Sequence, residues 1–243
     1  MPKQSKRLSA LKAQVDRSRR YTPTEAFQSV KQVANAKFDE SIDVAVRLGV
    51  DPKHADQMVR GTCTLPHGTG KGVSILVFAE GDAAVAAKAA GADFVGADDL
   101  IAKIRNENWF GFDKAVATRS MMPKLAKDLG RILGPRGLMP NPKIGTVVEP
   151  EDMSSAIQEL KRGKIDFRVE KAGIIHTSIG RKMMQANELE DNFHALLASL
   201  IRLKPATSKG VYVKAITVSS TMGPGIKVDV STAVATASQL GGA

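Results

Sequence analysis

The two ends of the chain carry all of its excess positive charge, and its middle carries none. Residues 71–160 hold 11 Lys and Arg against 12 Asp and Glu, whereas the two ends together hold 24 basic and 13 acidic residues. If the ends fold together, they form one basic domain around a near-neutral insertion. The sequence therefore predicts a discontinuous basic domain (1–68 and 162–230), an inserted domain (69–161) and a flexible tail (231–243).

The composition favours a soluble protein with a polyanionic partner. The chain has 243 residues and a formal net charge of +10, with a sequence pI near 9.7, which favours nucleic acid first and an acidic membrane second. A hydrophobic content of 43% is enough for real cores. Cys63 is the only cysteine, so we expect no internal disulfide and a reducing compartment. No apolar run reaches bilayer length and the chain does not open on a signal peptide, which predicts a cytoplasmic protein without a membrane partner.

Alternating strand and helix patterns in the middle predict an α/β insertion. Val73–Ala79 is a continuous apolar run, typical of a strand that is buried on both faces of a parallel sheet. The segments that follow alternate between helix and strand: Asp82–Ala90, Phe94–Val95, Asp98–Arg105, Ala115–Ala117, 120–128 and Glu151–Arg162. This order indicates an open α/β fold, and we expect a Rossmann-like three-layer domain.

The two ends predict an α/β sandwich domain. Ser41–Leu48 alternates like a half-buried strand, and Thr22–Glu25 reads as a capping box before a helix. Residues 3–20 read as a basic amphipathic helix, and the tail after Ser231 is expected to fray. The other expected elements are a strand at Arg60–Leu65, a β-hairpin of Lys164–Val169 with Ile174–Ile179, a helix at Glu188–Leu203, and strands at Val211–Ser219 and Ile226–Val230.

Residues 129–147 are too rich in Gly and Pro for a regular element and too apolar for a free linker. We therefore expect a shaped loop over the whole stretch. Arg131, Arg136 and Lys143 put cations on it without an offsetting carboxylate. A phosphate-binding loop and a rigid turn with solvated cations are equally good interpretations of this segment alone.

Patterns typical of enzymes and metal sites are missing. His67–Gly72 resembles a phosphate-binding loop, but it precedes a strand and no Ser or Thr follows its lysine. A glycine-rich hinge between domains, made of Gly68, Gly70 and Gly72 with Gly163 on the returning strand, explains it better. The four histidines and Cys63 lack metal-ligand spacing, so we expect no metal and no cofactor.

A polar turn between two predicted strands is the best candidate for contact with RNA. Aromatic residues make up only 5% of the chain, which argues against a base-stacking platform and favours folded RNA, read through phosphates and 2′-hydroxyls. Residues Ser219–Gly225 offer three hydroxyls beside glycine backbone that RNA could approach closely. An ordinary strand-to-strand turn explains these residues equally well. In the first interpretation Thr221 donates to and accepts from a 2′-OH, and Gly223 admits the RNA.

Several long motifs resemble one protein family. They are Arg131–Lys143 (RILGPRGLMPNPK), Gly49–Gly61 (GVDPKHADQMVRG), Leu65–Lys71 (LPHGTGK) and Thr221–Gly223 (TMG). In this order they resemble the L-one family of large-subunit ribosomal proteins of the bacterial type. The resemblance covers nearly the whole chain up to about Val230.

The resemblance implies a non-catalytic ribosomal protein, monomeric outside the ribosome. Its implied partners are the mobile stalk of 23S rRNA in the large ribosomal subunit, the tRNA at the adjacent exit site, whose release it assists, and its own operon mRNA, whose translation it represses. The resemblance further implies that the domain of both chain ends grips the RNA while the insertion moves on a hinge. The RNA-binding residues that it implies are Lys37, Phe38, Glu40, Ser41, Lys164, Arg168, Lys171, His176, Ser219, Thr221, Met222 and Gly223. We expect Phe38 to pack beneath the contact as a rigid wall, and an ordinary core position is the alternative for this ring.

The alternative from another class is a nucleotide-dependent enzyme that uses the inserted domain. Such an enzyme needs a phosphate-binding turn after the Val73–Ala79 strand. Glu80-Gly81-Asp82 places carboxylates there instead. This disfavours the alternative.

Overall fold

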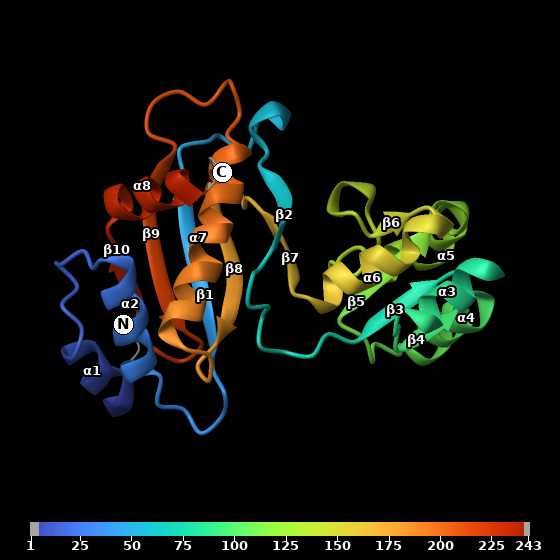
Figure 1. Ribbon diagram of the computed structural model, residues 1–243, viewed down its shortest axis with the longest axis horizontal. Coiled ribbons are helices and arrows are strands. Elements are labelled where there is room, and N and C mark those ends of the chain that lie inside the picture. The colour runs from blue at the N-terminus through green and yellow to red at the C-terminus, as the bar shows by residue number, and fades with distance from the viewer. Residues whose placement is uncertain (1–4, 241–243) are drawn as a thin grey trace. The chain divides into compact units, whose positions relative to one another are not determined.

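The computed structural model describes residues 5–240 and is a mixed α/β protein (Figure 1). Its chain divides into two compact units. The first comprises the residues up to Lys71 together with those from Gly163 onward, and the second comprises Gly72–Arg162.

A four-stranded antiparallel sheet with helices on one face forms most of the first unit. The strand order is β10 (Ile226–Val228), β9 (Val213–Ser220), β1 (Ser41–Leu48) and β8 (Ile174–Arg181). Alternate residues of β1 are buried, as the sequence pattern predicts. They share one core with the apolar faces of three helices: α2 (Pro23–Val33), α7 (Ala186–Arg202) and α8 (Val230–Leu240).

The predicted capping box opens α2. Thr22 Oγ1 accepts a hydrogen bond from the Glu25 amide, and the Glu25 carboxylate accepts one from the Thr22 amide. The Phe27 ring packs edge-on against Phe193 of α7, with centroids 5.4 Å apart. Local capping and core packing therefore fix the same helix.

The predicted hairpin of Lys164–Val169 with Ile174–Ile179 is wrong. β7 (Lys164–Arg168) pairs with β2 (Arg60–Thr64) in a separate two-stranded antiparallel sheet, while β8 pairs along its length with β1. Two backbone hydrogen bonds close the turn between β7 and β8: the Gly173 amide donates to the Glu170 carbonyl, and the Glu170 amide donates to the Ile174 carbonyl. The two strands do not pair with each other beyond this turn. A short 3₁₀ helix, η1 (Ala55–Gln57), precedes β2.

The basic N-terminal helix is shorter than predicted. α1 spans Lys6–Ala13, within the predicted range 3–20, and Lys3 lies outside the described residues. The chain turns after α1 because the Asp16 carboxylate accepts hydrogen bonds from both the amide and the hydroxyl of Ser18. Such local side-chain bonds compete with helical backbone bonds.

The prediction of a frayed tail after Ser231 is wrong up to Leu240, because this segment belongs to α8. Ala233 and Ala237, one helical turn apart, are fully buried in the core, and α8 packs against α7. Small side chains allow this close approach, so the weak apolar pattern of the segment hides a buried helix face. Residues 241–243 lie outside the described part of the chain.

The second unit is a parallel sheet covered by helices on both faces. The strand order is β4 (Phe94–Gly96), β3 (Ile75–Phe78), β5 (Lys114–Thr118) and β6 (Val147–Val148). All four residues of β3 are buried, as predicted, and successive residues enter two different cores. The helices α4 (Asp98–Glu107) and α5 (Met122–Leu133) pack against the sheet in one core. The helices α3 (Asp82–Ala89) and α6 (Met153–Lys161) pack against it in the other. Three 3₁₀ helices are η2 (Arg119–Met121), η3 (Pro142–Ile144) and η4 (Pro150–Asp152).

The loop predicted for 129–147 begins only at Gly134. α5 continues through Gly130 to Leu133, because Leu125, Leu129 and Leu133 form one fully buried stripe. An internal glycine costs a helix only about 1 kcal/mol, which this burial outweighs. From Gly134 to Thr146 the chain is an irregular loop, as predicted, that contains the short 3₁₀ helix η3, and β6 begins at Val147.

We expect that a charge on the inner face of α8 destabilises the first unit. Ala237→Asp places a carboxylate in the apolar core and should lower the free energy of unfolding by at least about 2 kcal/mol. Ala235→Asp, on the exposed face of the same helix, is the matched control and should cost less than about 1 kcal/mol. Urea titrations measure both; equal stabilities of the two variants would show that the helix does not pack.

Candidate nucleic-acid interface

The buried carboxylate of Glu40 joins segments that are far apart in the chain. Its Oε1 accepts a hydrogen bond from the Ala36 amide at 2.8 Å, and its Oε2 accepts one from the Met222 amide at 2.9 Å. The Glu40 carbonyl accepts a third from the Lys182 amide at 2.9 Å. Because Glu40 has no exposed surface, water does not compete for these bonds. The loop before β1 and the turns after β8 and β9 are therefore fixed together.

Glu40 is ionised in this setting. Burial by itself would raise the pKa of its carboxyl, but the hydrogen bonds that it accepts, helped by the Arg7 charge, lower that pKa below its ordinary value of 4.5. Hydrogen bonds to an ionised acceptor are stronger than those to a neutral one. A lowered carboxyl pKa stabilises the fold at neutral pH, and this stabilisation is lost as the pH falls from about 4.5 through the folded-state pKa.

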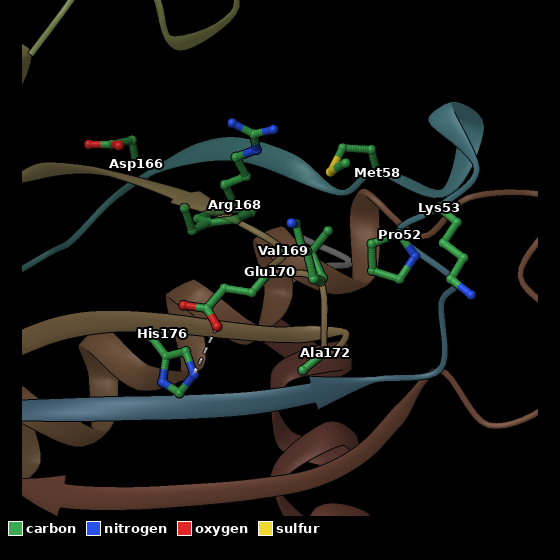
Figure 2. A pocket seen from close by; sticks show the side chains of 11 residues that line it. Pro52, Lys53, Met58, Asp166, Arg168, Val169, Glu170, Ala172 and His176 are labelled. Atoms are coloured by element: carbon green, nitrogen blue, oxygen red, sulfur yellow. Dashed lines mark ion pairs between the residues drawn. The ribbon is translucent and has the colours of Figure 1, made fainter. Parts of the chain in front are cut away.

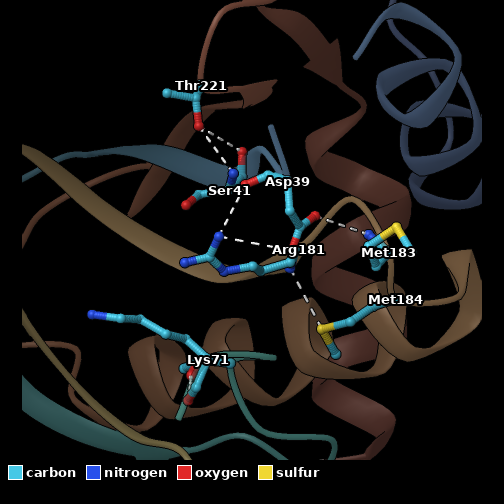
Figure 3. Close-up of polar contacts among 8 residues, drawn as sticks. Asp39, Ser41, Lys71, Arg181, Met183, Met184 and Thr221 are labelled. Carbon is cyan, nitrogen blue, oxygen red and sulfur yellow. Dashed lines mark hydrogen bonds and ion pairs between the residues drawn. The ribbon is translucent and has the colours of Figure 1, made fainter. Parts of the chain in front are cut away.

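Thr221 makes a second connection, to the first residue of β1 (Figure 3). Its hydroxyl accepts from the Ser41 amide at 3.0 Å and donates to the Ser41 carbonyl at 3.3 Å. The expectation that this hydroxyl donates to a 2′-OH therefore needs correction, because its proton is already used within the protein. One oxygen lone pair remains, and Thr221 is exposed, so the hydroxyl can still accept a hydrogen bond.

Two large apolar side chains are exposed beside these bonds. Phe38 is 53% exposed and Met222 is 51% exposed. The exposure of Phe38 excludes an ordinary core position for this ring, and Glu40 occupies the interior under the turn instead. Its role as a wall beneath an RNA contact stays a prediction. Arg7 of α1 donates one bond to the Met222 carbonyl at 2.8 Å and another to Asn35 Oδ1 at 2.6 Å.

Gly223 is required by the turn itself. A β-carbon on Gly223 would lie 2.4 Å from the hydroxyl oxygen of Ser220, which is 2% exposed. The Gly223 amide also donates to the Ser220 carbonyl. Close approach of RNA is therefore not needed to explain this glycine. A larger residue at position 223 would disturb the turn itself, so its effect on RNA binding could not be separated from its effect on folding.

Ser219 begins a row of short polar side chains on the sheet face that the helices leave open. It pairs with Asp43 of β1, which pairs in turn with Ser178 of β8. Burial raises the pKa of Asp43, although the Ser178 hydroxyl and His176 oppose the rise. His176 is exposed farther along the same face, opposite Ala45. These residues line a path along the sheet away from Thr221.

Other predicted contact residues lie in a separate groove of about 990 Å³ (Figure 2). Arg168, Lys171 and His176 line it, and His176 Nε2 is 3.9 Å from the Glu170 carboxylate. Lys171 lies in the turn beside the far end of β1 from Ser41, so it is not brought to the Thr221 turn. Lys164 begins β7 and is not a groove residue.

The structure therefore brings only part of the predicted set together. The residues gathered around Glu40 are Lys37, Phe38, Ser41, Ser219, Thr221, Met222 and Gly223. Sequence reasoning missed Asn35, Arg181 and the specific role of Arg7. Arg181 donates to the Asp39 carbonyl at 2.9 Å, and its guanidinium lies 3.7 Å from the Asp39 carboxylate. The basic run at the N-terminus pointed to Arg7 only as a generic cation, and no local pattern pointed to Arg181.

Three of the four predicted hinge glycines have positive φ angles: Gly68 (67°), Gly70 (69°) and Gly163 (101°). A β-carbon on Gly163 would lie 2.5 Å from the Gly68 Cα atom, so the two crossing segments need glycine where they meet. Gly72 is not in this conformation. Hinge motion itself stays a prediction.

Within residues 5–240, no cluster of His, Cys, Asp and Glu is arranged to hold a metal ion. No helix in that part of the chain combines the length and apolarity that crossing a bilayer requires.

Comparison with known proteins agrees with the motif resemblance. Residues 30–224 match the model of the Ribosomal protein L1p/L10e family. The chain is 55% identical over 230 residues to a protein of Bdellovibrio bacteriovorus named large ribosomal subunit protein uL1, covering 95% of this chain and 97% of that protein. The family match includes Glu40 and the Thr221 turn, and stops before α8.

We predict that Glu40→Gln destabilises the first unit by about 1–3 kcal/mol at pH 7, because the amide group faces a backbone N–H with a second donor. The difference from wild type should shrink as the pH falls below about 4.5, where the wild-type carboxyl loses its charge. Urea titrations at pH 7 and pH 3 measure this, with the exposed Glu170→Gln as control. A gap that widens in acid would contradict it.

Proposed function

The chain belongs to the Ribosomal protein L1p/L10e family, and from this premise we propose that it binds the 23S rRNA stalk of the large ribosomal subunit. The proposed site is the Thr221-Met222-Gly223 turn together with the loop before β1 that contains Glu40. As a member of this family the chain is a structural, non-enzymatic constituent of the ribosome. The alternative of a nucleotide-dependent enzyme is therefore wrong. The carboxylates of Glu80 and Asp82, where β3 leads into α3, agree with that correction.

One observation carries the proposed RNA site. In the Thr221-Met222-Gly223 turn, the Met222 amide is bonded to the buried Glu40 carboxylate, and the Thr221 hydroxyl is bonded to the Ser41 backbone. The side chains of Thr221 and Met222 nevertheless remain exposed. A polar turn that merely joined two strands would not need a buried carboxylate beneath it. Preorganised contacts lose less conformational entropy on binding, which favours recognition of a folded RNA surface.

The remaining parts of the proposal follow from the family resemblance. The protein assists release of deacylated tRNA from the exit site and represses translation of its own mRNA by binding a stalk-like structure there. The discontinuous basic domain grips the RNA, and the Rossmann-like inserted domain moves on the crossing glycines. The groove residues Arg168, Lys171 and His176 contact the RNA farther along the sheet face.

Thr221→Ala should weaken binding of a stalk RNA fragment about tenfold to hundredfold, because it removes a hydrogen bond inside a closed contact. Thr221→Ser keeps the hydroxyl and should bind nearly like wild type. The dependence of log affinity on log salt should stay unchanged in both, since no phosphate contact is lost. Salt-series titrations measure this, with thermal melts as folding controls. Wild-type affinity in a folded Thr221→Ala variant would remove the turn from the interface.

The two lysines of α1, Lys6 and Lys12, should add affinity without selectivity; Lys6 is exposed and Lys12 is half-buried. Arg7 and Arg19 are unsuitable for this test, because Arg7 holds the Met222 carbonyl and Arg19 pairs with Glu25 at 2.7 Å. Replacing Lys6 and Lys12 by alanine should reduce the salt slope by roughly 1 unit per lysine and weaken all RNA sequences alike. An unchanged slope would show that these lysines are only solvated.

A further inference from the structure

Exposed apolar side chains concentrate around the loop before β1 that contains Glu40. Among residues 5–239, the large apolar side chains left exposed are Phe38, Val85, Met183, Leu203, Val211 and Met222. Three of these, Phe38, Met183 and Met222, flank the dipeptide Asp39–Glu40. Met183 is the most exposed of all, at 78%.

Hydrogen bonds hold Met183 in this group. The Met183 amide donates to Asp39 Oδ1 at 3.3 Å, and the preceding Lys182 amide donates to the Glu40 carbonyl. Figure 3 shows the two connections: Thr221 is bonded to Ser41, and the Met183 amide is bonded to Asp39. Glu40 lies between Asp39 and Ser41 in the chain and so joins the two pairs. The turn after β8 is therefore part of the same rigid surface as the turn after β9.

Met183 and Met184 have opposite environments. The Met184 sulfur accepts a hydrogen bond from the Arg181 amide at 3.5 Å, and its side chain packs against the core of the first unit. Met183 makes no such contribution to the core, so burial does not account for an apolar side chain at this position.

The nearest arginines use their donors within the protein. Arg7 is bonded to the Met222 carbonyl and Asn35, and Arg181 is bonded to Asp39. A surface of Phe and Met suits the uncharged parts of RNA, since aromatic rings stack on bases and methionine sulfur contacts aromatic rings favourably.

Resting on the proposed function, we propose that Met183 is a further RNA-contacting residue. With Phe38 and Met222 it forms one apolar surface that binds ribose and base faces of the rRNA stalk. Met183 contributes to selectivity for the stalk RNA over other RNAs, and it does not contribute to the electrostatic attraction of phosphates.

Met183→Gln tests this, because glutamine has a similar length but a polar end. It should weaken binding of the stalk RNA fragment about threefold to tenfold, with an unchanged salt slope and an unchanged melting temperature. Met183→Leu keeps an apolar side chain and should bind close to wild type. Val85→Gln, at a 68% exposed position of the second unit, is the matched control and should have no effect.

Methyl NMR of ¹³C-labelled methionine gives an independent readout. The Met183 methyl signal should shift on addition of the stalk fragment, and the Met184 signal should shift less.

The outcomes separate this inference from the proposed function. If Thr221→Ala weakens binding while Met183→Gln binds like wild type, the inference is wrong and the proposed site stands. If neither change weakens binding, both are wrong. A Met183→Gln defect that changes the salt slope, or that Met183→Leu reproduces, would also overturn an apolar contact.

Discussion

A buried carboxylate in a strongly basic protein holds the candidate RNA surface together. Glu40 receives backbone N–H groups from its own loop and from the turn after β9, and its carbonyl receives one from the turn after β8. An ionised carboxylate suits this position because it accepts several hydrogen bonds and offers no donor that would repel an amide. The exposed side chains of Phe38, Met183 and Met222 have fixed positions only because the backbone beneath them is fixed.

The basic residues of the first unit serve two different purposes. Arg7 and Arg181 bind carbonyl and carboxylate groups of the protein, and so stabilise the loops that surround Glu40. Lys6 and Lys12 lie on α1, whose buried residue is Leu11, and they suit long-range attraction of a polyanion. Net charge therefore indicates the class of partner, but it does not indicate which cations meet that partner.

Short-range patterns predicted single elements well. The Thr22–Glu25 capping box, the alternation in Ser41–Leu48 and the apolar run that forms β3 all gave the correct element, because each depends on neighbours within a few residues. The errors arose where distant contacts decided. β7 pairs with β2 and not with its sequence neighbour β8, and small alanines make α8 a buried helix that its composition conceals.

The sequence by itself determined the charge partition, the family motifs and the Thr221-Met222-Gly223 turn, since these need only residue identity and order. Tertiary structure alone decided that Glu40 is buried, that Phe38 is exposed and that Met183 joins the same surface. The physical reason is that hydrogen bonds such as that between Glu40 and Met222 connect residues 182 positions apart. No periodicity along the chain records such a contact, because it exists only once β1, β8 and β9 lie side by side in one sheet.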